Sequence, residues 1–308
     1  MSIRRIPSRA HVAWNYAAWV LPFRAMRRRV LVLRYHAIGR PEDVAAYASP
    51  GISVTRERFD AQVGFLTRHY DVIDLDAAAA RVAGEDTPRR PGVVITFDDG
   101  YRDNFEHALP VLRKHGATGT FYVVAGSVWP GPALWTVRLR HIVPRADGSV
   151  RDLTRKLRAL PADLRERELR ELAARAGRDD GAGSRIMMDA AEIKAMVEGG
   201  MTIGAHTLTH PLLPEVPEAE ARHELVAGRA TLEAIVGRPV THLSYPNPGD
   251  GAQHDASVRA AAREAGYVSA TTSTGGILSR SSDPLAIPRV GVTPGFQERL
   301  LFRFLGER

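Results

Sequence analysis

The chain of 308 residues contains no cysteine, and lysine occurs only at positions 114, 156 and 194. The absence of cysteine excludes disulfides, zinc ribbons and thiol nucleophiles, so a metal site must use His, Asp or Glu. The net charge of +7 is therefore carried almost entirely by arginine. Much of this arginine alternates with acids, as in residues 163–168, and does not form the basic stripe with interleaved aromatics that is typical of nucleic-acid binding. We expect no nucleic-acid partner.

Residues 1–29 form a basic and aromatic N-terminal segment, which we predict to be helical. Its apolar run, VAWNYAAWVLPF at 12–23, is too short to cross a bilayer. The run has no small-residue cleavage site and is interrupted by Asn15, so we expect no cleavable signal peptide. Two interpretations stay open: an interfacial helix in peripheral membrane contact, or a helix that covers one end of the domain. The expected location is cytoplasmic, or peripheral at the inner face of the membrane. Oligomeric state is not indicated.

Residues 30–308 show short β-rich runs that alternate with helical stretches. This alternation favours an α/β fold with parallel strands, and about seven strands fit a barrel better than a short open sheet. The predicted strands are 30–35, 71–75, 93–97, 119–124, 202–205, 241–245 and 267–270. The predicted helices are 56–69, 104–115, 189–198, 217–236 and 257–265.

Residues 127–188 interrupt this alternation of strands and helices with a Trp- and Pro-rich start followed by a charged helical stretch. The insertion leaves the C-terminal end of the predicted strand 119–124, which is the catalytic face in parallel α/β barrels. It is either an independent helical excursion without chemistry or a wall or lid of the substrate site. A rough apolar stripe runs along it, formed by Leu153, Leu157, Leu160, Leu164, Leu169 and Leu172.

Two motifs carry chemistry. The first, TFDDG at 96–100, ends a β-branched run in Asp98 and Asp99, two adjacent carboxylates that a divalent metal would stabilise. The acids could instead cap the helix that starts near Asn104. The second motif, HTLTH, places His206 and His210 four residues apart, a spacing that puts both on one face of a helical turn and suits metal ligation. They could also be solvated loop histidines.

Both motifs follow predicted strands, so in a barrel they open on the same face. Two histidines and one carboxylate leave coordination positions open for water and substrate. The second acid is then free to act as a base. Together the motifs predict a metal-dependent hydrolytic centre.

TFDDG and HTLTH, in this order and spacing, resemble the motifs of the polysaccharide deacetylase family, also called the NodB-homology or carbohydrate esterase family 4 domain. The resemblance covers roughly residues 30–295 and implies a distorted (β/α)7, TIM-like barrel, here with a helical insertion on the catalytic face. It implies zinc, or else cobalt, nickel or manganese, and removal of acetyl groups from an acetylated sugar or glycan. By resemblance, Asp98 is the catalytic base, and Asp99, His206 and His210 are the metal ligands.

Other stretches resemble the Tyr-His branch of the family, which includes exopolysaccharide N-deacetylases. They are Tyr35-His36 and the Tyr245-Pro246 stretch, where the resemblance implies that the Tyr245 N–H helps to bind the oxyanion. The better-known branch has an arginine before its Pro-Tyr and a late Leu-x-His that protonates the leaving amine, and both are missing here. The resemblance to this branch implies that His36 is the acid. The alternative is a structural histidine at a strand end. Arg289 could contact the base or the substrate, or form a surface salt bridge.

The leading hypothesis is therefore hydrolysis of an acetamido group, a carbon–nitrogen bond, on a sugar or glycan. An O-acetyl esterase or a non-sugar amidase would use the same residues. A non-catalytic glycan-binding module is a further alternative, although a binder need not retain both carboxylates. Glycoside hydrolysis is disfavoured, since its two carboxylates must flank the bond from opposite sides.

Overall fold

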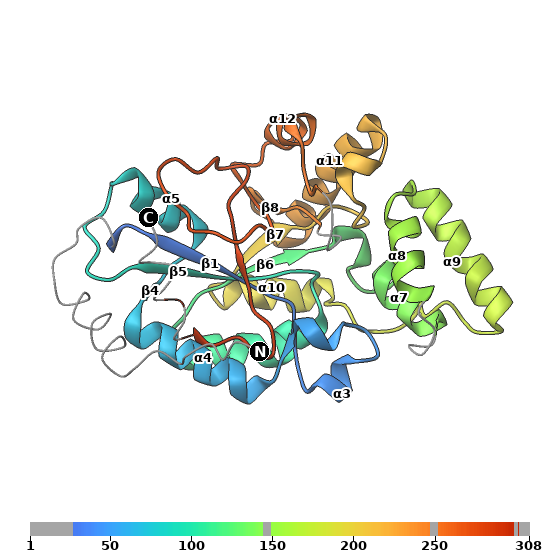
Figure 1. The fold of residues 1–308 in the computed structure, drawn as a ribbon, viewed down its shortest axis with the longest axis horizontal. Helices are drawn as coiled ribbons and strands as arrows, with labels where there is room; N and C mark the ends of the chain where they lie inside the picture. The colour runs from blue at the N-terminus through green and yellow to red at the C-terminus, as the bar shows by residue number, and fades with distance from the viewer. Residues whose placement is uncertain (1–26, 144–148, 247–251, 299–300, 302–308) are drawn as a thin grey trace, which may run out of the picture.

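The computed structural model describes residues 27–143, 149–246, 252–298 and 301, and its centre is a curled sheet of parallel strands (Figure 1). The strands lie in the order β10-β1-β5-β6-β7-β8-β9, and β4 pairs with β5 beside this path. A separate pair is formed by β2 and β3. The bounds are β1 Val30–Tyr35, β2 Ala37–Ile38, β3 Ser53–Val54, β4 Asp71–Val72, β5 Gly92–Phe97, β6 Thr120–Val123, β7 Thr202–Ala205, β8 His242–Ser244, β9 Ser269–Thr271 and β10 Val290–Gly291.

Helices pack around this sheet and connect its strands, as expected for parallel pairs. The α-helices are α3 Pro41–Val44, α4 Arg56–His69, α5 Leu75–Ala83, α6 Leu109–Lys114, α7 Trp135–Ile142, α8 Ser149–Arg158, α9 Ala162–Ala176, α10 Ala190–Glu198, α11 Glu218–Val236 and α12 Ala256–Glu264. A π-helical turn, η2 Asn104–Ala108, leads into α6, and short 3-10 turns are η1 Pro50–Ile52, η3 Ala125–Ser127 and η4 Leu213–Glu215. The distorted barrel that the sequence predicts is confirmed.

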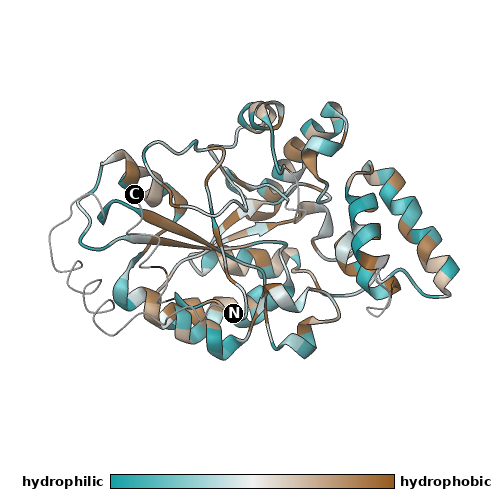
Figure 2. Ribbon diagram, in the orientation of Figure 1, coloured by the Kyte–Doolittle hydropathy of each residue, from teal (hydrophilic) through white to brown (hydrophobic). Residues whose placement is uncertain are grey.

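The central strands β1 and β5 pair in register over their whole length, from Val30 opposite Gly92 to Tyr35 opposite Phe97. Every residue of β5 is buried, as expected for a parallel strand covered on both faces. Figure 2 shows both strands as mainly hydrophobic at the centre of the molecule. Because the two strands end side by side, the residues that follow them, His36 and Asp98, emerge at the same edge of the sheet.

The segment that leads into β10 connects the two edges of the curled sheet. Ile287 forms a parallel bridge with Thr271 of β9, and β10 pairs with β1 on its other side. Arg289 lies between these two contacts and is fully buried. The fold thus carries this late arginine into the interior of the barrel.

The insertion forms a helical unit of α7, α8 and α9 at one end of the molecule (Figure 1). Its apolar residues, among them the fully buried Leu157 and Leu169, form one cluster with residues of the barrel side such as Ala37 and Tyr101. The predicted leucine stripe is therefore correct in part, because Leu164 is 37% exposed.

The N-terminal segment 1–29 lies outside the described residues except for its last three positions. The prediction of membrane contact falls on that segment. Among the helices that the structure describes, none is long and apolar enough to span a bilayer.

Candidate active site

The two acids of TFDDG reach one site because the chain turns sharply after β5. Asp99 has a φ of 77° and Gly100 a φ of 80°, so both residues lie in the left-handed region. Glycine adopts this conformation at little cost, whereas the aspartate is strained in it. In a regular strand the two side chains would point to opposite faces. The turn allows both carboxylates to lie at the same edge of the sheet.

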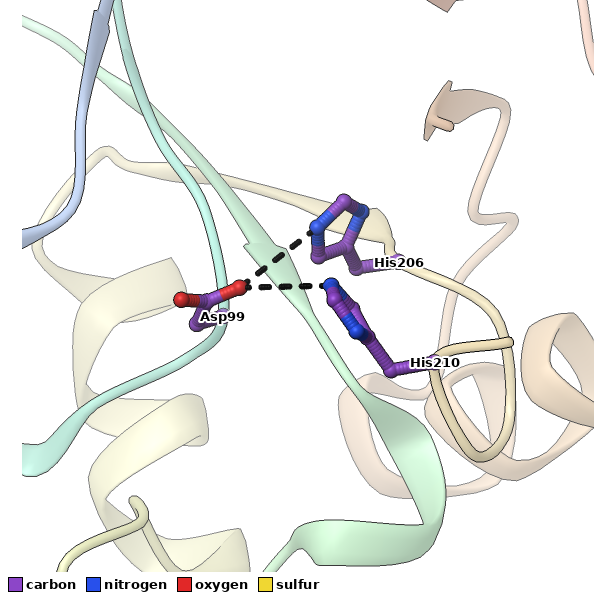
Figure 3. Close-up of side chains that lie close together, drawn as sticks. All are labelled: Asp99, His206 and His210. Atoms are coloured by element: carbon purple, nitrogen blue, oxygen red, sulfur yellow. Dashed lines mark ion pairs between the residues drawn. The ribbon is translucent and has the colours of Figure 1, made fainter. Parts of the chain in front are cut away.

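Asp99, His206 and His210 converge into a cluster of metal-ligand type, in which one donor atom of each lies within 4.8 Å of the others (Figure 3). The Nε2 atoms of both histidines lie 3.6 Å from Asp99 Oδ1. A tetrahedral zinc site with bonds of about 2.0–2.1 Å would place its ligand atoms about 3.3 Å apart. The donor set suits a divalent cation, and the 3.6 Å spacings are near this value, whereas the widest spacing of 4.8 Å would have to shorten on binding.

The protonation of the two histidines also suits metal binding. Burial lowers the pKa of both His206 and His210 to about 4, because desolvation disfavours the imidazolium form. Both rings are therefore neutral at pH 7, which is the form that binds metals. The His206 Nδ1 lies 2.7 Å from the Ser244 carbonyl oxygen, to which it donates as the neutral ring, and this leaves Nε2 free to face Asp99.

The HTLTH segment is not the helical turn that the sequence predicts. It is a loop in which Thr207 and His210 have φ values of 66° and 63°, both left-handed. These turns bring the two imidazoles edge to face, with ring centroids 4.8 Å apart. The convergence of the ligands thus depends on loop conformation and not on helical spacing.

Asp98 is held by Arg289 in a buried bidentate ion pair. Both oxygens of Asp98 accept a hydrogen bond from the guanidinium at 2.7 Å. The other donors of Arg289 are also used, by Thr96 Oγ1, Thr272 O and Ser244 Oγ. Although burial opposes ionisation, the charges of Arg289 and its neighbours keep the pKa of Asp98 far below its usual range. Of the three roles considered for Arg289, the structure favours the first, since the guanidinium contacts Asp98.

His36 joins the same site from the end of β1. Its Nε2 lies 4.0 Å from Asp98 Oδ2, and its side chain is 14% exposed. Burial lowers the pKa of His36, while Asp99 and Asp98 partly oppose this shift. Tyr35, by contrast, points into the core and stacks on Phe97. Of the Tyr-His pair, Tyr35 is therefore a core residue, and only His36 belongs to the site.

The Tyr245 N–H is not free to donate a hydrogen bond to an oxyanion. It already donates to the Thr271 carbonyl oxygen at 3.1 Å, as part of the pairing between neighbouring strands. Its hydroxyl donates to the Leu285 carbonyl at 3.0 Å. The prediction for Tyr245 is thus wrong in this structure. Pro246 has no N–H, and the next amide belongs to Asn247, outside the described residues.

The helical insertion reaches the metal-ligand cluster. A cavity of about 70 Å³ lies between α7, α8 and the loop after His210. Its lining includes Trp135, Thr136, Thr154, Arg158, His210 and Pro246. Of the two interpretations of residues 127–188, this contact favours a wall of the substrate site over an independent excursion.

Several buried residues around the ligands were not predicted from the sequence. Tyr101 is 2% exposed, and burial together with the nearby Asp99 raises the pKa of its hydroxyl; its place directly after TFDDG could have drawn attention to it. The backbone of the HTLTH loop is also hydrogen-bonded to side chains of three helices that are distant in the sequence, namely Glu224, Trp135 and Arg165. No local pattern marks these three, because their partners lie from 15 to 75 residues away in the chain.

Comparison with known proteins identifies the family. The sequence model of the polysaccharide deacetylase family matches residues 85–270, which is more than half of the chain. The chain belongs to this family. It is therefore a hydrolase of the class that acts on carbon–nitrogen bonds of acetylated polysaccharides. YxkH of Bacillus subtilis, which is named as a polysaccharide deacetylase, is 23% identical over 265 residues, covering 86% of this chain and 71% of YxkH.

Solved structures show the same fold. The deacetylase PplD of Streptococcus pyogenes, solved in complex with acetate, superposes with a TM-score of 0.64 at 20% identity, over 90% of this chain and 98% of PplD. IcaB of Ammonifex degensii gives a TM-score of 0.61 at 20% identity, over 91% of this chain and 97% of IcaB.

Proposed function

We propose that the chain removes acetyl groups from acetamido sugars of a polysaccharide, with a divalent cation at Asp99, His206 and His210 and with Asp98 as general base. The family supports glycan deacetylation. The observation that carries the finer proposal is the arrangement of the site, where an ionised, arginine-held carboxylate lies next to a buried cluster of one carboxylate and two neutral imidazoles.

The donor set favours zinc among the divalent cations, since two imidazoles and one carboxylate with open positions are a common catalytic zinc set. When bound, such a cation supplies an activated water and polarises the acetyl carbonyl. The chain provides both imidazole ligands in the neutral form that binds metals, because desolvation lowers the pKa of His206 and of His210 to about 4.

Asp98 accepts the proton that the attacking water loses. Arg289 fixes both carboxylate oxygens, so the base is ionised at neutral pH and keeps one orientation. The water oxygen forms a bond to the acetyl carbon, the carbon–nitrogen bond breaks, and acetate leaves. General base catalysis by a positioned carboxylate is worth about 10²–10⁴-fold.

His36 donates the proton that the leaving amine requires. Its Nε2 lies 4.0 Å from Asp98 Oδ2, so it borders the same site. Since burial lowers its pKa, the resting ring is neutral, and the proton that it donates comes from the hydrolytic step by way of Asp98. The segment where the better-known branch has its late histidine is buried here around Ile287, Arg289 and Val290 and carries no acid, which leaves this role to His36.

Metal analysis combined with acetate release tests the proposal. Wild-type protein should hold one divalent cation and release acetate from N-acetylated glycans. Asp98→Asn should keep the metal and lose activity by about 10²-fold or more, because it removes the base but no ligand. His206→Ala should lose both.

His115→Ala is the matched control for the loss of a histidine, since His115 pairs with Asp60 on the outer helices and not with the site. It should keep metal and activity. Full activity of Asp98→Asn, or a wild-type protein that binds no divalent cation, would contradict the proposal. Acetate release from O-acetyl esters alone would favour the esterase alternative.

A further inference from the structure

The two histidines of the HTLTH loop are anchored in different ways. The His206 ring is oriented by its own hydrogen bond to the Ser244 carbonyl at 2.7 Å. The Nδ1 of His210 is buried but has no hydrogen-bond partner among the described residues. Metal-binding histidines usually depend on such a partner for their orientation. The position of His210 must therefore be set by its backbone.

The backbone at His210 is strained and needs external support. Thr207 and His210 both adopt left-handed φ values, which are energetically unfavourable for residues with a Cβ. Within the loop, the His210 N–H donates to Thr207 Oγ1 at 3.0 Å. Strained conformations of this kind persist only when the surrounding structure holds them.

The helical insertion supplies much of that support. The Trp135 indole of α7 donates to the His210 carbonyl at 2.9 Å. The Arg165 guanidinium of α9 donates to the Thr209 carbonyl at 3.2 Å and to Thr209 Oγ1 at 2.6 Å. Arg165 also lies over the Trp135 ring, 5.6 Å from its centroid. Trp135 is 4% exposed and Arg165 1%, so both contacts are shielded from water.

Glu224 of α11 completes the support from the barrel side. Its carboxylate accepts from the N–H groups of Leu208 and Thr209, at 2.8 and 2.7 Å. Burial lowers the pKa of Arg165, and the negative charge of Glu224 opposes this shift. The loop is thus held between the barrel, through Glu224, and the insertion, through Trp135 and Arg165.

We propose that Trp135 and Arg165 are positioning residues for His210, so that the insertion is part of the metal centre and sets its affinity for the cation. This inference rests on the proposed function, since it requires that a divalent cation binds at Asp99, His206 and His210. Loss of either contact lets the loop relax from its left-handed conformation. His210 then moves away from Asp99, while His206 keeps its own anchor.

Zinc affinity, measured by chelator competition, tests the proposal. Trp135→Phe keeps an aromatic ring but removes the N–H donor, and Arg165→Met keeps much of the side-chain length but removes the charge and all donors. Each should weaken zinc binding by about 10- to 100-fold, the usual effect of losing an outer-shell partner. Arg165→Lys keeps one cationic donor and should recover part of the affinity.

Arg138→Met is the matched control. Like Arg165 of α9, Arg138 of α7 is a buried arginine of the insertion, 2% exposed, but it pairs with Glu166 and Asp180. It should cost stability without changing zinc affinity by more than about two-fold. The visible absorption bands of the cobalt-loaded protein should change for Trp135→Phe and not for Arg138→Met, since these bands report ligand geometry.

The outcomes separate the two proposals. If wild-type protein binds no zinc or cobalt, the proposed function fails. If it binds and both Trp135→Phe and Arg165→Met bind within two-fold of it, the proposed function stands and the positioning role is overturned. An equal loss in Arg138→Met also overturns it, because general packing would then explain the effect. If Arg165→Met does not fold, Trp135→Phe decides the matter alone.

Discussion

Replacement of Arg289 by methionine should destabilise the protein mainly through the charge that it leaves behind. Asp98 is 2% exposed, and in Arg289→Met both of its oxygens lose their charged partner. Removing one member of a buried ion pair costs about 3–5 kcal/mol. A typical domain has about 5–15 kcal/mol of total stability, so the variant should unfold at a much lower urea concentration.

A double-mutant cycle separates this charge effect from the loss of side-chain packing. Urea unfolding is measured for wild type, Arg289→Met, Asp98→Asn and the double variant, with a chelator present throughout so that metal binding does not contribute. In the double variant, the Asp98→Asn change removes the carboxylate charge that would otherwise be left unpaired. The double variant should therefore recover at least about 2 kcal/mol relative to the sum of the single losses.

The pH dependence gives an independent check on the same reasoning. Without Arg289, burial raises the pKa of Asp98 above its unfolded value of about 3.9, so the neutral form is favoured in the folded state. The loss relative to wild type should then be largest near pH 7 and should shrink as the pH falls and Asp98 takes up a proton. A coupling energy below about 0.5 kcal/mol, or a loss that does not change with pH, would refute the central role of the Asp98–Arg289 pair.

Three further predictions concern the same region. In metal-free protein, burial lowers the pKa of His206 and of His210 to about 4, so below pH 6.5 these two side chains bind protons in the unfolded chain but not in the native one. The free energy of unfolding, measured by urea titration, should therefore decrease as the pH is lowered from about 6.5 to 4. A profile that does not change with pH would contradict the burial of the two rings. Gly126→Ala would place a Cβ 2.7 Å from the Leu208 carbonyl oxygen and should cost about 1–3 kcal/mol, whereas Gly183→Ala meets nothing within 4 Å and should lie within about 0.5 kcal/mol of wild type by thermal unfolding. His36→Ala should reduce amide hydrolysis by about 10²-fold or more but ester hydrolysis much less, because an alkoxide needs less help from an acid; equal losses on both substrates would argue against His36 as the acid.

Much of the barrel could be predicted from local sequence patterns. The expected strand 30–35 and the expected helix 56–69 coincide with β1 and α4, where apolar periodicity is strong. Most other strands are shorter than predicted; the expected 71–75 is only Asp71–Val72, since helix α5 begins at Leu75. The expected helix 104–115 starts with a π-helical turn, η2, that no periodicity indicates.

The metal-ligand cluster was also predictable, although the local geometry of its histidines was not. Adjacent acids after a buried strand and two histidines after another must meet where parallel strands end together. The helical geometry expected for His206 and His210 is wrong, because left-handed turns at Thr207 and His210 bring the rings together instead. The expected amide of Tyr245 is wrong as well, since strand pairing occupies it.

The sequence by itself determined the chemistry of the site, because residue types and their places after apolar runs identify Asp98, Asp99, His206 and His210. It also excluded any thiolate from the ligand set. Only the tertiary structure decided how these groups are held. Arg289 lies 191 residues from Asp98 in the chain, and Trp135 lies 75 residues from His210, yet each makes a direct hydrogen bond there. Such contacts depend on sheet order and helix packing, which place distant segments together, and no local pattern encodes that placement.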